Sequence, residues 1–463
     1  MKTQAQPRAL YLLNFVSMWE CFSYYGMRVL LVLFMVHELH YEDGQAFGLY
    51  ALYTTLVEFG GVLGGLAADR YLGLKRSIVC GGVTIALGHL CMVLPDSQLS
   101  FFLGLGLIIS GTSLFRSNVA AFLSEFYEEN DPRRDAGYTL YYTGINLGGF
   151  LASILCGIVG EVYGWHAGFG LAAIGMLAGN IALYMGRKML QDKGEIAQPI
   201  QNANLVSVAG LAATALVSGV ALYFYFYVMP LFPFVAAGLV YYIYRQIKGS
   251  VSTGMQGFGR LGLYLVFMVI YYGCEEQLGS SLVLFAERHV NRETLFGSIP
   301  AASLVTFNPL TILIIGPFVA YLLQKIRLDG LNKIGLSFTF LGAAFGLLYA
   351  GGMFLTISQE VSLGYAVGSI VLISIGELLI GPTVYVTASE VAPKALQGLV
   401  MGTVTLAFSL ANLFSGFLSQ MMAVGETDNS LEVYTSGFWL IGCGSLALAL
   451  TIIMINNRQK VFA

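Results

Sequence analysis

The segment from Ser17 to Arg28 carries a group of polar side chains within a long apolar run. In a helix, offsets of three and four residues place Glu20, Tyr24 and Arg28 on one face, together with Tyr25. If the segment spans a bilayer, an acid and a guanidinium are costly in hydrocarbon, so they should face a shared polar cavity. The residue types predict a site that binds a small charged molecule.

Further ionisable and amide side chains lie within other apolar runs. They are Glu58, Arg116, Asn118 and Asn146 in the first half of the chain, and Glu275, Glu276, Asn308 and Glu377 in the second. Each is a functional candidate because polar groups are expensive inside a membrane, although a structural salt bridge between helices explains some equally well. In a cavity between the two halves of the chain, the lining cations would come mainly from the first half and the lining acids from both. This dipolar lining suits a zwitterion.

The composition is that of a membrane protein. Of 463 residues, 57% are hydrophobic and 11% are charged, whereas about 25% charged residues are usual in soluble domains. The net charge of −3 gives no indication of nucleic-acid binding. The six cysteines lie in apolar segments without paired or metal-like spacing, so we expect no disulfide framework, metal or cofactor. The first apolar run has no cleavage site, which indicates a retained span.

Apolar segments of about 20 residues, the length that crosses the hydrocarbon core, follow one another along the chain. We predict an all-α membrane protein with fourteen transmembrane helices, near 10–36, 46–68, 77–95, 99–122, 138–160, 166–186, 205–226, 231–244, 260–286, 297–323, 332–353, 361–388, 396–423 and 433–456. Six form an N-terminal bundle in 1–190, two lie in a linker at 191–250, and six form a C-terminal bundle in 251–463.

The distribution of Lys and Arg tests this count, because these residues accumulate in cytoplasmic loops. All 23 except Arg28, Arg116, Arg288 and Arg292 lie at the termini or in loops that alternation assigns to the same side as the termini. The opposite loops, such as 37–43, hold acids and no Lys or Arg. We therefore expect a multi-pass plasma-membrane protein with both termini in the cytoplasm.

A loop signature occurs twice. Gly64 to Arg76 runs from a Gly-rich helix end into Asp69-Arg70 and a basic turn, and Gly316 to Lys333 contains a degraded copy with Asp329-Gly330. Basic cytoplasmic turns can look alike by chance, but the first copy closely resembles the loop signature of the major facilitator superfamily. Matching loops in two six-span halves imply a parallel repeat, the arrangement of that superfamily.

Longer runs resemble the proton-dependent oligopeptide transporters of this superfamily. These runs are Tyr24 to Arg28, Arg116 to Asn118, Asp131 to Tyr138, Tyr142 to Gly148, Glu276 to Ser281, Asn308-Pro309, and Gly376 to Leu379 leading to Ala392-Pro393-Lys394. The resemblance covers nearly the whole chain, and bacterial members also carry two inserted helices. It implies a monomeric secondary transporter of the bacterial inner membrane that imports di- and tripeptides or peptide-like zwitterions by alternating access, coupled to protons.

The resemblance also implies roles for individual residues. Arg28, and Arg116 where the family usually has Lys, would hold the peptide carboxylate, which Arg can bind through two parallel hydrogen bonds. Glu377 would hold the ammonium group, while Glu275 is as readily structural. The residues expected to hydrogen-bond the peptide or shape its pockets are Asn146, Asn308, Tyr25, Tyr24 and Tyr272. Most of the 27 Tyr and 31 Phe, however, are expected to be packing or lipid-facing residues.

The first helix departs from the family pattern, which usually reads Glu-x-x-Glu-Arg-Phe-x-Tyr-Tyr. Ser17 and Cys21 replace the first Glu and the Arg. In the family these groups are linked to proton coupling, together with the acid that matches Glu276, so the usual coupling route is in question. Glu20 remains but has lost its adjacent cation, and we expect it still to exchange a proton.

Glu58 stands where the family usually has an aromatic residue, shortly before Gly60-Gly61. Glu58 either replaces the lost proton carrier or binds a cationic group of the substrate. The alternative is that Glu58 is protonated and neutral and packs against a neighbouring side chain. The proton-coupling candidates are therefore Glu20, Glu276 and Glu58.

Three other functional classes are possible for a chain of this composition. An enzyme would need a nucleophile–base set or metal ligands, and three of the five His lie in predicted external loops without metal spacing. A channel would need a repeated pore motif, which the sequence lacks. The serious alternative is a transporter of the same fold that carries a non-peptide or peptide-like metabolite with weak or no proton coupling, as a uniporter or exporter. The altered first helix favours this alternative.

Overall fold

The computed structural model describes most of the chain. The described residues are 5–94, 97–128, 131, 133–191, 193–195, 203–235, 237–238, 240–241, 245, 255–295, 297–326, 328–354, 360–392, 397–425 and 429–461. The chain divides into two compact units. Unit 1 contains Met1–Leu31 and Leu56–Tyr225, and unit 2 contains Val32–Thr55 and Phe226–Ala463.

Long helices make up the first unit. In chain order the elements here are α1 (Arg8–His37), α2 (Asp43–Ala67), the π-helical turn η1 (Ala68–Leu72), α3 (Leu74–Val93), α4 (Gln98–Ser124), α5 (Arg134–Tyr163), α6 (Trp165–Met185), the 3-10 turn η2 (Arg187–Leu190) and α7 (Ala203–Tyr223), with the C-terminal end of α1 and the N-terminal end of α2 belonging to unit 2. Helix α3 packs along both α4 and α6, and α4 along α7. Close packing is possible because glycines face neighbouring helices.

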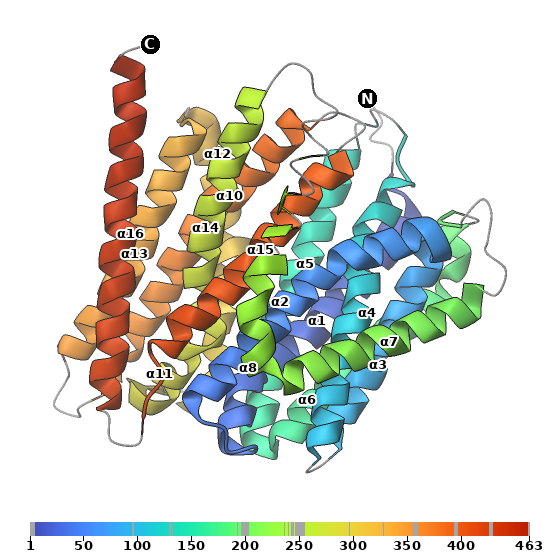
Figure 1. The fold of residues 1–463 in the computed structure, drawn as a ribbon, viewed down its shortest axis with the longest axis horizontal. Coiled ribbons are helices and arrows are strands. Elements are labelled where there is room, and N and C mark those ends of the chain that lie inside the picture. Colours follow the sequence, from blue (N-terminus) through green and yellow to red (C-terminus); the bar gives the residue numbers. More distant parts are fainter. Residues whose placement is uncertain are drawn as a thin grey trace. The chain divides into compact units, whose positions relative to one another are not determined.

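The second unit is also mainly helical. Its remaining elements are α8 (Tyr225–Val228), η3 (Met229–Leu231), α10 (Met255–Glu275), η4 (Glu276–Gly279), α11 (Ser281–His289), β1 (Val290–Asn291), β2 (Glu293–Thr294), β3 (Gly297–Ser298), η5 (Ala302–Thr306), α12 (Phe307–Lys325), α13 (Gly330–Met353), β4 (Val361–Ser362), α14 (Leu363–Val391), α15 (Gln397–Gln420) and α16 (Ser430–Val461). Strands β1 and β4 pair in parallel, and β2 and β3 antiparallel. Helices α13 and α16 run side by side (Figure 1).

Twelve of the fourteen predicted spans agree with the helices, and the predicted count of fourteen is not reached among the described residues. Twelve helices among the described residues are long and apolar enough to cross a membrane, and a further pair, Val208–Tyr223 and Tyr225–Val235, is bent by 90°. The predicted pair at 205–226 and 231–244 falls on this bent region, and part of its second member lies outside the described residues. The predicted all-α membrane class is thus confirmed, whereas the domain boundaries at 190 and 250 stay a prediction.

An ion pair holds the 32–55 hairpin within unit 2. The guanidinium of Arg288 contacts both carboxylate oxygens of Asp43, at 2.6 and 2.7 Å, and donates to the Tyr434 hydroxyl at 3.1 Å. The backbone N–H of Val424 also donates to Asp43, at 3.3 Å. Because a bidentate Arg–carboxylate pair is among the strongest side-chain contacts, Arg288 from the loop-facing end of α11 has a structural role here.

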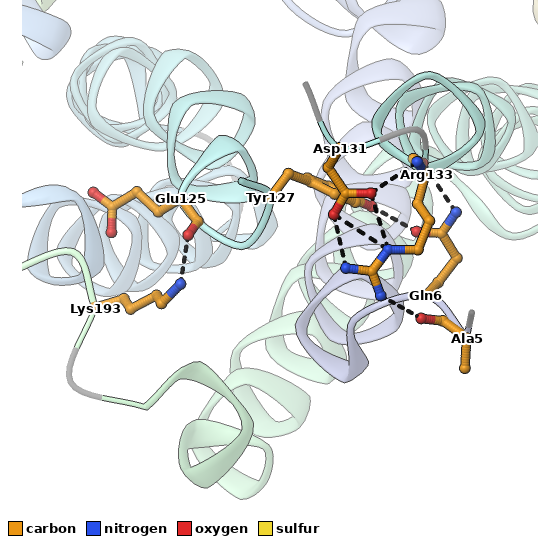
Figure 2. A network of polar contacts seen from close by, with 7 residues as sticks. All are labelled: Ala5, Gln6, Glu125, Tyr127, Asp131, Arg133 and Lys193. Carbon is orange, nitrogen blue, oxygen red and sulfur yellow. Dashed lines mark hydrogen bonds and ion pairs between the residues drawn. The ribbon is translucent and has the colours of Figure 1, made fainter. Parts of the chain in front are cut away.

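The loop between α4 and α5 binds the chain that precedes α1 (Figure 2). The guanidinium of Arg133 pairs with Asp131, with Nη2 2.7 Å from Oδ2, and donates to the Ala5 carbonyl at 2.8 Å. Gln6 Nε2 donates to the Arg133 carbonyl at 3.0 Å, and the Tyr127 hydroxyl donates to Gln6 Oε1 at 2.9 Å. We call these five residues the N-terminal clasp.

The chain that follows α6 also contacts the C-terminal end of α4. Lys193 Nζ donates to the Glu125 carbonyl at 2.5 Å (Figure 2), and the Gly194 N–H donates to the Glu125 carboxylate at 2.8 Å. Gly194 has a φ of +76°, which favours glycine at this turn. Leu190 is buried in the same hydrophobic cluster as Phe122. The end of α4 is therefore held from two directions.

The clasp should respond to pH. Hydrogen bonds from Arg133 hold the pKa of Asp131 below its ordinary value, so the pair stabilises the clasp above the ordinary Asp pKa and loses this contribution as pH falls through the lowered one. We expect Asp131→Asn to speed hydrogen–deuterium exchange at residues 5–10 at pH 7, while variant and wild type become alike in acid. Equal protection at pH 7 would contradict this.

Candidate functional site

Close packing between α1 and α5 fixes the polar face of α1. A Cβ on Gly148 would overlap the Met18 carbonyl oxygen, and a Cβ on Gly26 would lie 2.5 Å from Cys156 Sγ. Gly148 therefore has to be glycine, since a larger side chain would push the two backbones apart, whereas at Gly26 the Cys156 side chain would have to shift. The rotation of α1 that results places Glu20 in the interior of unit 1, where its exposed fraction is 2%.

Arg116 of α4 lies between two carboxylates. Its Nη2 is 3.1 Å from Glu20 Oε1, and its Nη1 is 3.5 Å from Glu58 Oε1 on α2. The Glu20 side chain is 2% exposed and the Glu58 side chain 26%. The expectation that Glu20 has lost its cation is therefore wrong, because α4 supplies one. Glu58 faces the same cluster, as expected if it has a functional role.

Two tyrosine rings of α1 complete this cluster. The Arg116 guanidinium carbon lies 4.3 Å from the Tyr24 ring centroid, and that of Arg28 lies 5.9 Å from Tyr24 and 5.8 Å from Tyr25. The faces of aromatic rings attract cations, and more strongly where water is excluded. Tyr25 packs against Gly149 of α5. The rings therefore stabilise two guanidiniums close to each other.

The two departures from the family pattern have partners of their own. Ser17 Oγ donates to the Tyr141 hydroxyl at 3.1 Å, and Cys21 Sγ donates to Glu20 Oε2 at 3.5 Å. Both side chains are buried. Small polar groups thus occupy the two positions where the sequence resemblance implies charges, and the Cys21 thiol contributes a weak hydrogen bond to the same carboxylate that pairs with Arg116.

The amides of unit 1 differ in role. Asn118 is buried and donates to the Gly64 carbonyl at 3.3 Å and the Leu114 carbonyl at 2.8 Å, so it joins α4 to α2. Asn146 is half-buried, and its amide donates to the Tyr142 carbonyl one turn earlier in α5, at 2.9 Å. Its predicted contact with a peptide stays a prediction.

Unit 2 contains a second polar cluster. Asn308, in the first turn of α12, donates through Nδ2 to Glu377 Oε2 at 3.0 Å and to Ser374 Oγ at 3.1 Å. The structure thus brings together two of the predicted substrate residues. Tyr272 is 7% exposed, packs against Phe408 with 4.6 Å between ring centroids, and approaches Gly381 of α14, one turn beyond Glu377.

The acidic pair of the span predicted at 260–286 lies at a break in the helix. Glu275 is the last residue of α10 and Glu276 the first of the 3-10 turn η4, and both side chains are half-buried. The next residue, Gln277, is 1% exposed. The adjacent break explains how two neighbouring acids occur within an apolar span.

Comparison with known proteins identifies the family. The sequence model of the POT family matches residues 75–440. The chain belongs to the POT family. Dipeptide and tripeptide permease A of Escherichia coli strain K12 is 29% identical, over 98% of this chain and 93% of that protein. The permease of the same name from Erwinia pyrifoliae is 30% identical, over 97% and 93%.

Solved structures of POT transporters have the same fold. A peptide transporter POT in complex with sulfate is 27% identical with a TM-score of 0.85, covering 99% of this chain and 96% of that one. A mutant POT bound to alafosfalin is 28% identical with a TM-score of 0.86 and the same coverage. A POT family transporter with 5-aminolevulinic acid, at 24% identity, a TM-score of 0.85 and 98% and 97% coverage, shows the fold alone. The predicted major facilitator fold is confirmed, and this POT-family protein is a transporter rather than an enzyme.

Sequence reasoning missed several polar residues of this POT-family protein. Tyr141 contacts Ser17, Ser374 contacts Asn308, and Ser415 and Ser419 contact Gln277. Ser415 and Ser419 are four residues apart, so they share one face of α15, and that spacing was the available signal. Isolated serines and tyrosines in apolar helices are too frequent to be selected by type alone.

The two carboxylates on Arg116 should differ in their contribution to stability. Glu20→Gln breaks a buried ion pair and should cost about 2 kcal/mol or more, whereas Glu58→Gln removes a longer, more exposed contact and should cost about 1 kcal/mol or less. The midpoint of thermal unfolding in detergent should fall further for Glu20→Gln. An equal fall, or the reverse order, would show that Arg116 does not depend mainly on Glu20.

Proposed function

We propose that this protein imports di- and tripeptides, or peptide-like zwitterions, by alternating access and with proton coupling. Membership of the POT family and similarity to two dipeptide and tripeptide permeases support this function. The observation that carries it furthest is the chemistry of the two clusters. One presents two guanidiniums on tyrosine rings, and the other presents a carboxylate oriented by an amide.

Arg28 is proposed as the principal ligand of the peptide carboxylate. Arg116 already donates to Glu20 and Glu58, so a substrate carboxylate at Arg116 would compete with them. Glu58 is the weaker competitor because its contact is longer, at 3.5 Å, and its side chain more exposed. We therefore expect the substrate to displace Glu58 from Arg116 and to leave Glu20 in place.

This competition provides a route for proton coupling. Protonation of Glu58 removes the charge that holds it to Arg116, and the freed guanidinium can then bind the substrate carboxylate. By linkage, a bound carboxylate also favours protonation of Glu58. Glu20 and Glu276 are the further proton-coupling candidates in this proposal, with Glu276 acting from unit 2.

The proposed contacts of the ammonium end and of the peptide backbone come from the remaining residues. Glu377 binds the ammonium group, and Asn308 keeps its carboxylate oriented, as the 3.0 Å hydrogen bond indicates. Asn146 and Tyr25 hydrogen-bond the peptide backbone, while Tyr24 and Tyr272 shape side-chain pockets. The proposed setting is the bacterial inner membrane, with both termini cytoplasmic and the protein acting as a monomer.

Loss of Arg28 should weaken peptide binding. Arg28→Ala removes a charge-assisted hydrogen bond, so the affinity for dipeptides should fall about tenfold or more. The measurement is thermal stabilisation by dipeptides, followed by counterflow in liposomes. Arg134→Ala, which removes a guanidinium from the start of α5 that lies over the Tyr138 ring, is the matched control and should bind as wild type does. Unchanged stabilisation in Arg28→Ala would refute the assignment.

Proton coupling has its own test. We expect Glu58→Gln to reduce the pH dependence of peptide uptake into liposomes, and Glu20→Gln to reduce it as well, because each removes a carboxylate that competes for Arg116. If both variants keep the proton dependence of the wild type, the coupling route through Arg116 is wrong.

One observation favours the second candidate function, transport of a non-peptide or peptide-like metabolite with weak or no proton coupling. Ser17 and Cys21 are buried and hydrogen-bonded where the family usually has charges. A thermal-shift screen of dipeptides, tripeptides, amino acids and peptide-like metabolites separates the two functions. Stabilisation by a metabolite and by none of the peptides would establish the alternative.

A further inference from the structure

Gln277 in the turn between α10 and α11 is held by α15. Its Nε2 donates to Ser415 Oγ at 3.0 Å and lies 3.2 Å from the carbonyls of Ser415 and Gly273. Its Oε1 accepts from Ser281 Oγ at 2.7 Å and from Ser419 Oγ at 2.9 Å. Gln277 and these three serines are at most 3% exposed. We call them the Gln277 network.

The Gln277 network is fully satisfied as well as buried. An amide has two N–H groups and an oxygen with two lone pairs, and here both ends of Gln277 have protein partners. Burying an amide costs free energy unless it is hydrogen-bonded, and an apolar side chain of similar volume would fill the same space without that requirement. Networks of this kind make a local structure rigid and unique. A role in setting geometry therefore accounts for Gln277 better than packing does.

A further serine, Ser280, links the Gln277 network to the backbone of the neighbouring acid, Glu276. Ser280 Oγ donates to the Glu276 carbonyl at 3.1 Å and lies 2.9 Å from Ser419 Oγ. The Glu276 backbone is thus tied to α15 on both sides, through its own carbonyl and through Gln277. Ser280 has φ −128° and ψ −98°, so the chain leaves helical geometry directly after η4. The direction of the Glu276 side chain depends on this turn.

Other ionisable groups surround η4. Glu275 precedes the turn, Tyr271 and Tyr272 lie one turn earlier in α10, and both tyrosines interact electrostatically with Glu275 and with Glu377 of α14. Tyr50 of the 32–55 hairpin packs its hydroxyl against Gly279. The partners that α15 contributes to the Gln277 network are serine groups, which do not titrate in the accessible range. A pH effect of changing Gln277 would therefore act through the acids.

We propose that Gln277 is a positioning residue for proton coupling: anchored by Ser415 and Ser419 of α15, it sets the backbone of η4 and thereby the direction of the Glu276 carboxylate. The inference rests on the proposed function, in which Glu276 takes part in proton coupling. It predicts that the proton step depends on hydroxyl groups of α15 that do not themselves carry a proton or contact the substrate.

The experiment compares Gln277→Met, Ser419→Ala and Glu276→Gln with wild type. Methionine keeps the volume of Gln277 but not its hydrogen bonds. In Gln277→Met we expect proton-driven accumulation of a dipeptide to fall about tenfold and the midpoint of its pH profile to be displaced by about one unit. In Ser419→Ala the accumulation and the midpoint should change in the same directions, but by less. Counterflow, which needs no net proton movement, should keep its KM within about twofold.

The matched control is Ser409→Ala. Ser409 is also a buried serine of α15, but its hydroxyl donates to the Thr55 carbonyl at 2.7 Å. It should leave the pH profile of uptake unchanged even if it lowers the thermal midpoint. A Gln277→Met variant that unfolds more easily but keeps the wild-type pH profile would overturn the proposal, as would an equal displacement in Ser409→Ala.

A coupling role of Glu276 and a positioning role of Gln277 predict different results for the variants. If Glu276→Gln keeps wild-type proton dependence, the role of Glu276 in coupling is wrong. If Glu276→Gln abolishes coupling while Gln277→Met has the wild-type pH profile, only the positioning role is wrong. If both positions act through the same carboxylate, the double variant should lose no more proton-driven accumulation than Glu276→Gln alone.

Discussion

The cost of placing charge in hydrocarbon governs the polar cluster of unit 1. Arg116 offsets this cost with two carboxylates, at 3.1 Å for Glu20 and 3.5 Å for Glu58, and with the ring of Tyr24. Together with Arg28, these groups carry no net formal charge. A substrate carboxylate added alone would leave one uncompensated negative charge, whereas a carboxylate added with one proton would not. In the proposed function the ammonium group of the zwitterion is balanced at Glu377, so within the unit 1 cluster a proton taken up together with the carboxylate would keep the local charge balance.

This balance depends on backbone packing as much as on the charged groups. Glu20 can reach Arg116 because Gly148 and Gly26 let α1 approach α5 closely enough to fix its rotation. In unit 2 the helix is interrupted at η4, and the Gln277 side-chain amide binds α15 there through Ser415 and Ser419. In both units a residue without charge determines where a charged one lies.

The sequence predicted the parts of the molecule that follow from local pattern. Apolar length predicted twelve of the spans correctly, and family motifs pointed to Asn308 and Glu377, which the structure joins by a hydrogen bond. It did not predict that Arg116 pairs with Glu20, because the two are 96 positions apart and motif reading considers only the neighbours in the chain. The 90° bend after Tyr223 and the Gln277 network were likewise missed, since both arise from contacts between helices.

The altered first helix can be judged by the charges it removes. Relative to the pattern that the sequence resemblance implies, Ser17 would remove one negative charge and Cys21 one positive charge, which leaves the net charge of the helix unchanged. By the same resemblance, Arg116 in place of Lys would preserve charge, while Glu58 in place of an aromatic residue would add a carboxylate. The cluster therefore keeps Glu20 on a cation and gains a second acid on the same guanidinium. Since a group that carries a proton must be able to lose its ionic partner, the partly exposed Glu58 is better suited to that role than the buried Glu20.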